Sequence, residues 1–134
     1  MIVKAFIEIG KDGLFGIYLA EDNKLPFGLM GTGDTVAAAK EDFDIAVEEM
    51  KQMYEEEKRK FPLFTVEFAY DVASFLQYYN QFMSLAGMQR LTGVSQGQLS
   101  HYINGYRKPS AKTAHKIQSK IHAFGKELQQ LHFV

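Results

Sequence analysis

Apolar and polar residues alternate over the first 20 positions in the manner of a β-hairpin. Residues 2–9 place an apolar side chain at every second position, and residues 14–20 form a second run rich in Phe, Ile and Tyr. The cluster Gly10-Lys11-Asp12-Gly13 between them is typical of a turn. We therefore predict two antiparallel strands, and the pattern allows a further short strand at residues 27–30.

An amphipathic helix is predicted next, because apolar residues recur at steps of three and four. Its apolar face comprises Val36, Ala39, Phe43, Ala46, Val47, Met50, Met53 and Tyr54. Asp34 or Thr35 can cap the N-terminus, and Pro62 prevents the helix from continuing unkinked. Residues 63–70 alternate again and predict another strand. The order β-β-α-β, with the possible extra short strand, indicates an α+β domain in which one helix crosses a small sheet.

Only helices are predicted after residue 70. Capping residues mark their starts: Asp71 before a helix to about residue 83, Ser84 before 85–92, Ser95 before 96–104 and Ser110 before a longer helix. The last helix has an apolar seam made of Ala114, Ile117, Ile121, Phe124 and Leu128. We therefore expect two domains, an α+β domain over 1–70 and an all-α domain over 71–134. Units this small are marginal alone and should lean on one another or on a second copy.

Charge is divided unevenly between the two halves. Residues 1–70 contain 8 basic and 14 acidic residues, whereas residues 71–134 contain 7 basic and 2 acidic ones. No acidic residue occurs between Asp71 and Glu127. This asymmetry favours a C-terminal half that binds a polyanion. The absence of cysteine and of a signal-like or membrane-spanning segment leads us to expect a cytoplasmic protein.

Candidate catalytic features are weak. The segment Gly31-Thr32-Gly33 could cradle a phosphate at a helix start, but it lacks the rest of a P-loop or dinucleotide motif, so a turn with a helix cap explains it better. The acidic residues between 41 and 49 spread around a helix and do not converge. His115 and His122 have no evident third metal ligand. We expect no enzyme activity, no cofactor and no metal.

The segment from Met88 to Gly105 resembles the helix-turn-helix of the Cro and phage-repressor type. Gly93 suits the positive φ of the tight turn, and Ser95 caps the second helix. Val94, Leu99 and Tyr102 or Ile103 would hold the second helix against the first. One departure is Gln89, which stands where that family commonly has alanine and would alter the crossing of the two helices.

This resemblance implies roles for individual residues. The residues expected in the major groove, where base edges are read, are Gln96, Gly97, Gln98, Ser100 and His101. The residues expected at phosphates are Arg90, Ser95, Asn104, Tyr106, Arg107 and Lys108. Gly97 reads nothing itself but would allow close approach. The stripe Lys112, Lys116 and Lys120 is either a further DNA contact or a solvated face.

The order of the parts resembles the HicB family of antitoxins. The likeness rests on the hairpin, the turn Gly31-Thr32-Gly33-Asp34-Thr35, the following helix with its Ala37-Ala38-Ala39, and the helix-turn-helix. Residues 21–26 look like an insertion. The family implies a partial RNase H-like N-terminal domain that binds and blocks a small HicA-type ribonuclease toxin, and a C-terminal domain that represses the protein's own operator.

Three functions follow as hypotheses. The first is an antitoxin and autorepressor whose acidic N-terminal domain binds a basic toxin, and which binds double-stranded operator DNA as a homodimer. The second is a stand-alone transcription regulator whose N-terminal domain senses a small molecule or only dimerises. The third is a metal-dependent nuclease, for which the convergent acids are not recognisable. The sheet edge or the terminal helix with Phe133 could form the dimer interface.

Overall fold

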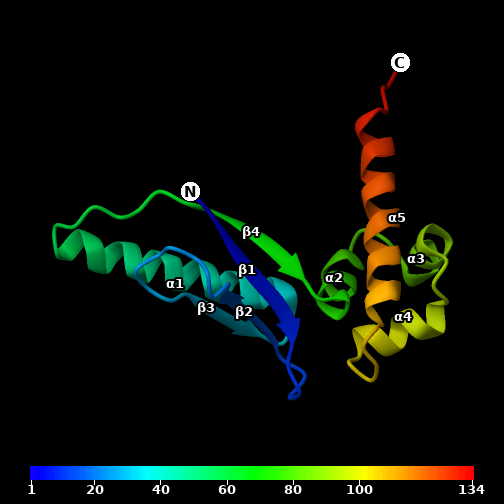
Figure 1. The fold of residues 1–134 in the computed structure, drawn as a ribbon, viewed down its shortest axis with the longest axis horizontal. Coiled ribbons are helices and arrows are strands. Elements are labelled where there is room, and N and C mark those ends of the chain that lie inside the picture. Colours follow the sequence, from blue (N-terminus) through cyan, green and yellow to red (C-terminus); the bar gives the residue numbers. More distant parts are fainter.

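The computed structural model describes residues 1–134 as a four-stranded sheet with one long helix, followed by four further helices (Figure 1). The N-terminal elements are β1 (Ile2–Ile9), β2 (Phe15–Leu19), β3 (Met30–Gly33), α1 (Val36–Glu56) and β4 (Thr65–Tyr70). The C-terminal elements are α2 (Val72–Tyr79), α3 (Leu85–Thr92), α4 (Gln96–Ile103) and α5 (Ala111–Gln129). The predicted succession of an α+β unit and an all-α unit is confirmed.

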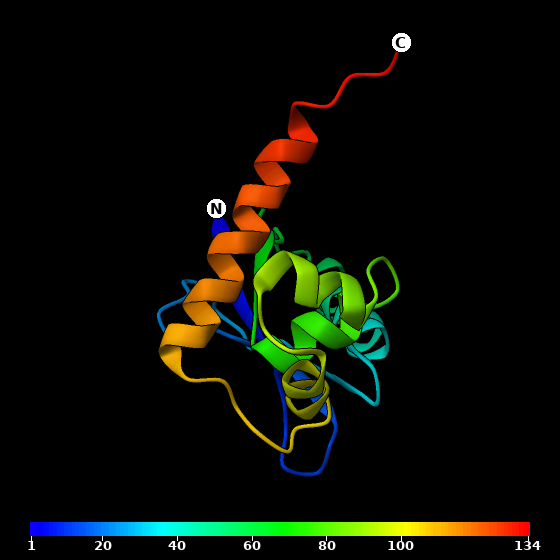
Figure 2. The same ribbon diagram turned by 90° about the vertical axis from the view of Figure 1, so that its right-hand side faces the viewer.

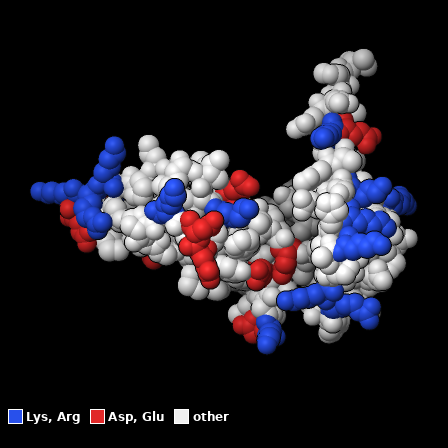
Figure 3. All heavy atoms as spheres, viewed as in Figure 1, with Lys and Arg blue, Asp and Glu red and all other residues white.

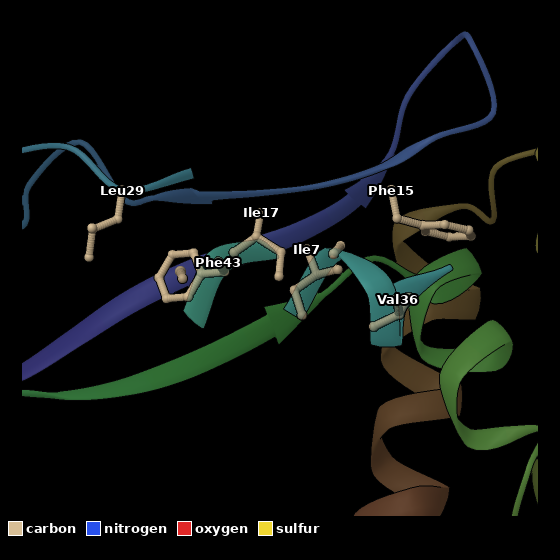
Figure 4. Packing of buried hydrophobic residues seen from close by; sticks show 8 residues of the cluster. Ile7, Phe15, Ile17, Leu29, Val36 and Phe43 are labelled. Carbon is tan, nitrogen blue, oxygen red and sulfur yellow. The ribbon is translucent and has the colours of Figure 1, made fainter. Parts of the chain in front are cut away.

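The sheet has the strand order β3-β2-β1-β4, with β1 and β4 parallel and the other pairs antiparallel. Alternation along β1 sends Val3, Ala5 and Ile7 to the face that α1 covers, and all three are buried. Phe15 and Ile17 from β2 lie on the same face with Phe43 of α1 (Figure 4). The core of the N-terminal domain therefore lies between one side of the sheet and α1.

Two glycines of β3 bring α1 unusually close to the sheet. A Cβ at Gly31 would lie 2.4 Å from the carbonyl oxygen of Ala39, and a Cβ at Gly33 would lie 2.6 Å from the backbone nitrogen of Ala39. Only glycine fits where two backbones approach this closely. The prediction of a turn at Gly31-Thr32-Gly33, and of a short strand at 27–30, is thus corrected: the glycines belong to a strand placed at 30–33, directly beneath the helix.

The caps predicted for α1 to α5 are all present. Thr35, rather than Asp34, caps α1 by accepting a hydrogen bond from the backbone of Ala38. Asp71, Ser84, Ser95 and Ser110 cap α2 to α5 in the same way.

Helix α2 is shorter than predicted. It ends at Tyr79 and not at Met83, and the backbone N–H of Phe82 bonds to the carbonyl only three residues back, that of Tyr79. As a result, Phe82 is 72 % exposed instead of facing the core.

Helix α2 contributes to both hydrophobic clusters of the molecule. Leu76 is buried in the C-terminal cluster, whereas Tyr78 packs against the cluster beneath the sheet. Hydrogen bonds join the same helix to the N-terminal domain: Gln77 Oε1 accepts from the N–H of Val36 at 2.9 Å, and Asp71 Oδ2 accepts from the N–H of Ile9 at 3.0 Å. The boundary near residue 71 is therefore a packed junction and not a flexible linker.

Helix α5 begins within the C-terminal core and then leaves it. Ile117 is buried and packs with the C-terminal cluster, and Ile121 is half-buried. Further along the predicted seam, Leu128 is 48 % exposed. Both views show the end of the helix and the last residues projecting away from the other helices (Figure 2).

Candidate nucleic-acid interface

The connection between α3 and α4 is a tight turn built around one glycine. Gly93 ends α3 in the left-handed conformation, with φ of 76°, which a residue with a side chain adopts only at a cost. The buried hydroxyl of Thr92 donates to the carbonyl of Met88 at 2.7 Å and accepts from the N–H of Val94 at 3.2 Å. The turn thus has its polar groups satisfied, and α4 leaves it in a defined direction.

Apolar side chains then hold α4 against its neighbours. Val94, Leu99 and Tyr102 are buried, as predicted, while Ile103 is half-buried. They pack with Leu76 of α2 and Ile117 of α5. Helix α4 therefore has one face fixed in the core and the opposite face turned to solvent, which is the arrangement that a helix entering the major groove requires.

Residues 83–121 match the Helix-turn-helix family model. This segment is a DNA-binding helix-turn-helix domain of the Cro and phage-repressor type. The match begins in the turn before α3 and ends within α5, so it covers less than half of the chain. No curated protein and no solved structure gives a significant match to the chain.

The structure of the helix-turn-helix brings the predicted base-reading residues onto one helix. Gln96, Gly97, Gln98 and His101 are exposed on α4, whereas Ser100 is half-buried and less available. A Cβ at Gly97 would meet no atom within 4 Å, so neither packing nor backbone conformation of the free protein requires glycine there.

The predicted phosphate-contacting residues flank this helix. Arg90 lies at the end of α3, and Ser95 uses its hydroxyl to accept from the N–H of Gln98 at 3.2 Å. Four more follow α4 and are exposed: Asn104, Tyr106, Arg107 and Lys108. The ring of Tyr106 meets that of His101 edge to face, with centroids 6.3 Å apart, which links the loop to the reading helix.

Gln89 has a role that the sequence pattern did not indicate. Its side chain is exposed, and its Oε1 accepts from the backbone N–H of Gln96 at 2.7 Å. Together with Ser95, it satisfies two of the free N–H groups at the start of α4. The alanine common at this position in related domains cannot make this bond. The altered helix crossing expected from Gln89 stays a prediction.

Acidic and basic side chains lie mainly on different domains, as the counts for residues 1–70 and 71–134 predict. Acidic groups gather on the N-terminal domain, and the helix-turn-helix end shows mainly lysine and arginine (Figure 3). Lys112, Lys116 and Lys120 are exposed on α5, and Lys116 Nζ lies near the turn, 3.2 Å from where a Cβ of Gly93 would be. Lys116 of this stripe therefore lies beside the helix-turn-helix connection.

Two further features bear on other kinds of site. No group of three or more His, Cys, Asp or Glu residues lies together as a metal site would require. No helix combines the length and the hydropathy needed to span a bilayer.

Proposed function

We propose that the protein is a transcription regulator that binds operator DNA through α4. The observation that carries this proposal is the helix-turn-helix domain itself, with its exposed α4 and the basic residues around it. In this proposal Gln96 and His101 meet base edges, and Arg107 and Lys108 meet phosphates.

We infer that the functional form is a homodimer, since one such module makes too few contacts for useful specificity. The end of α5 offers an apolar surface for this purpose: Leu128, Leu131 and Phe133 are 48 %, 56 % and 96 % exposed. The edge strands of the sheet, β3 and β4, are the other candidates. A change of mass on sedimentation after Leu128→Lys would identify the terminal helix as the interface.

The finer proposal is that the protein is the antitoxin of a HicA/HicB-type pair. Its support is the succession of a β-β-β-α-β domain and a helix-turn-helix, as in the family that the sequence resembles, and the acidic surface of the N-terminal domain. Exposed acids on α1, including Glu48 and Glu49, suit a basic ribonuclease partner.

A binding titration tests the regulator. The full-length protein is titrated on a duplex from upstream of its own gene and on a coding duplex of equal length and base composition. We expect the upstream duplex to bind about 10³-fold or more tightly at physiological salt. Gln96→Ala and His101→Ala should reduce this preference while circular dichroism remains unchanged. Equal affinity for both duplexes would count against an operator near the gene.

Co-expression tests the antitoxin. The product of a short neighbouring reading frame should arrest growth, and this protein should relieve the arrest. His101→Ala should still relieve it, because DNA reading and partner binding lie on different domains, whereas Glu48→Lys with Glu49→Lys should not. If the neighbouring gene product does not arrest growth on its own, the antitoxin role is contradicted, but the proposed DNA-binding regulator is not.

A second candidate is a regulator that senses a small molecule, and a groove in the N-terminal domain favours it. This hollow of about 300 Å³ is lined mainly by apolar residues of α1, β4 and the segment before β4, among them Val47, Phe61 and Val66. Ligand-dependent DNA binding that Val47→Arg abolishes would support the sensor over the antitoxin.

A further inference from the structure

The β1–β2 hairpin of the N-terminal domain lies beside the loop that follows α4. Ile9, the last residue of β1, shows this contact: a Cβ at Gly105 would lie 3.5 Å from the Cδ1 of Ile9. Residues of both segments, including Lys11, Arg107 and Lys108, line one groove of about 490 Å³. The two segments lie side by side at the lower edge of the molecule in both ribbon views (Figures 1 and 2).

The hairpin is held firmly in this position. The N–H of Ile9 donates to Asp71 Oδ2 at 3.0 Å, and the N–H of Asp71 donates to the carbonyl of Ile7 at 2.9 Å. Asp71 also caps α2 through its Oδ1. The same side chain therefore connects the end of β1 to the start of α2. The turn is closed by a bond from Gly10 N–H to the carbonyl of Leu14 at 2.7 Å.

The basic groups in this region are unpaired, whereas the acidic groups accept hydrogen bonds. Lys11, Arg107 and Lys108 are exposed and form no ion pair. Three carboxylates are also present. Glu8 accepts from the Tyr18 hydroxyl, both oxygens of Asp71 accept backbone N–H groups, and Asp12 accepts from the N–H of Leu14. Of these three, only Asp12 and Glu8 are exposed.

From this geometry we infer that the β1–β2 hairpin is part of the DNA interface, with Lys11 contacting the phosphate backbone beyond the loop 104–108. The inference rests on the proposed DNA binding by α4. A duplex carries one negative charge per about 1.7 Å of its axis, so a backbone that passes Arg107 and Lys108 presents further phosphates to the adjoining hairpin. The N-terminal domain then adds affinity without reading sequence.

Salt-dependent titration of the full-length protein on a 30-base-pair duplex of random sequence tests this contact, because phosphate contacts do not depend on an operator. Lys11→Ala should weaken binding several-fold at low salt and reduce the slope of log K against log salt by about 0.9. Arg107→Ala should do the same. Lys60→Ala removes an equal charge from the exposed segment that follows α1 and should leave both quantities unchanged.

A second variant, Asp12→Asn, should change the duplex affinity in the opposite direction. Asp12→Asn removes the neighbouring negative charge yet keeps an oxygen for the N–H of Leu14, so the turn is preserved and affinity should rise. Unchanged binding of Lys11→Ala and Asp12→Asn, alongside a loss for Arg107→Ala, would overturn the inference and leave the proposed function intact. Failure of the unsubstituted protein to bind any duplex would overturn both.

Discussion

Gln77 of α2 caps α1 across the junction of the two domains: its Oε1 accepts the N–H of Val36 at 2.9 Å. Val36 is fully buried and is the first residue of α1, so no preceding helical turn can accept its N–H. Thr35 serves the N–H of Ala38 instead. A side chain of one domain therefore completes the start of the main helix of the other.

Loss of this bond should destabilise the protein. Gln77→Ala leaves the N–H of Val36 buried and unpaired, and we expect the free energy of unfolding in urea to fall by about 1–3 kcal/mol. Gln77→Glu keeps an acceptor and places a negative charge at a helix N-terminus, so it should retain most of the stability. Equal unfolding midpoints for the unsubstituted protein and Gln77→Ala would refute the role of this bond.

Replacement of Gln89 should separate stability from DNA binding. Gln89→Ala removes the acceptor for Gln96 and should lower the free energy of unfolding by about 0.5–1.5 kcal/mol. Gln89→Glu keeps an acceptor, so unfolding should be little affected. It also adds a negative charge at the start of α4, the helix that is proposed to bind DNA, so duplex affinity should fall. Parallel denaturation and duplex titrations distinguish the two effects, and a Gln89→Glu protein that binds DNA normally would place this residue away from the backbone.

Gly97→Ala should have opposite effects on folding and on function. Glycine inside a helix costs about 0.5–1 kcal/mol relative to alanine, and the space around Gly97 is empty, so the alanine variant should unfold at higher urea. The added methyl group should nevertheless weaken operator binding, because it stands where the groove approaches α4. Gly125→Ala in α5 is the matched control: it also meets no atom within 4 Å and should raise stability alone. Tighter DNA binding by Gly97→Ala would contradict the close approach.

The aromatic cluster at the domain junction should make stability sensitive to alkaline pH. Burial raises the pKa of Tyr70 and of Tyr79 above the ordinary value of 10.0. The folded protein therefore keeps these phenol protons at a pH where the unfolded chain has lost them. The contribution of these two tyrosines to the free energy of unfolding is complete below pH 10 and is lost as the pH rises through their folded-state pKa values.

Urea denaturation between pH 9 and pH 11, a range of about one unit on either side of the ordinary pKa of tyrosine, tests this dependence. Tyr70→Phe should make the alkaline fall in unfolding free energy shallower. The exposed Tyr106 supplies a control, and Tyr106→Phe should follow the unsubstituted protein. Identical slopes for all three proteins would show that Tyr70 does not contribute to the decline.

Local signals in the sequence were sufficient for most elements. Helix starts at Asp71, Ser84, Ser95 and Ser110 were predicted because a capping side chain bonds to backbone only three residues away. The helix-turn-helix was equally readable, since Gly93 and the buried residues after it lie within one short segment. The charge asymmetry needed only a count.

Errors arose where distant segments decide the local structure. The glycines of β3 look like a turn when read alone, and only the position of α1 shows why they form a strand. Phe82 fits a helical apolar face, but α2 ends before it and leaves it exposed. Periodicity reports which residues could face a core; it does not report where the backbone stops.

The class of each half, the helix-turn-helix and the separation of charge follow from the sequence, because they depend on neighbours along the chain. The tertiary structure alone decided how the halves join and what meets near α4. The bond between Gln77 and Val36 spans 41 residues and that between Ile9 and Asp71 spans 62, so no local pattern encodes either. The same packing sets the β1–β2 hairpin beside the loop after α4, since the direction of β1 is set by its parallel pairing with β4, which leads directly into α2.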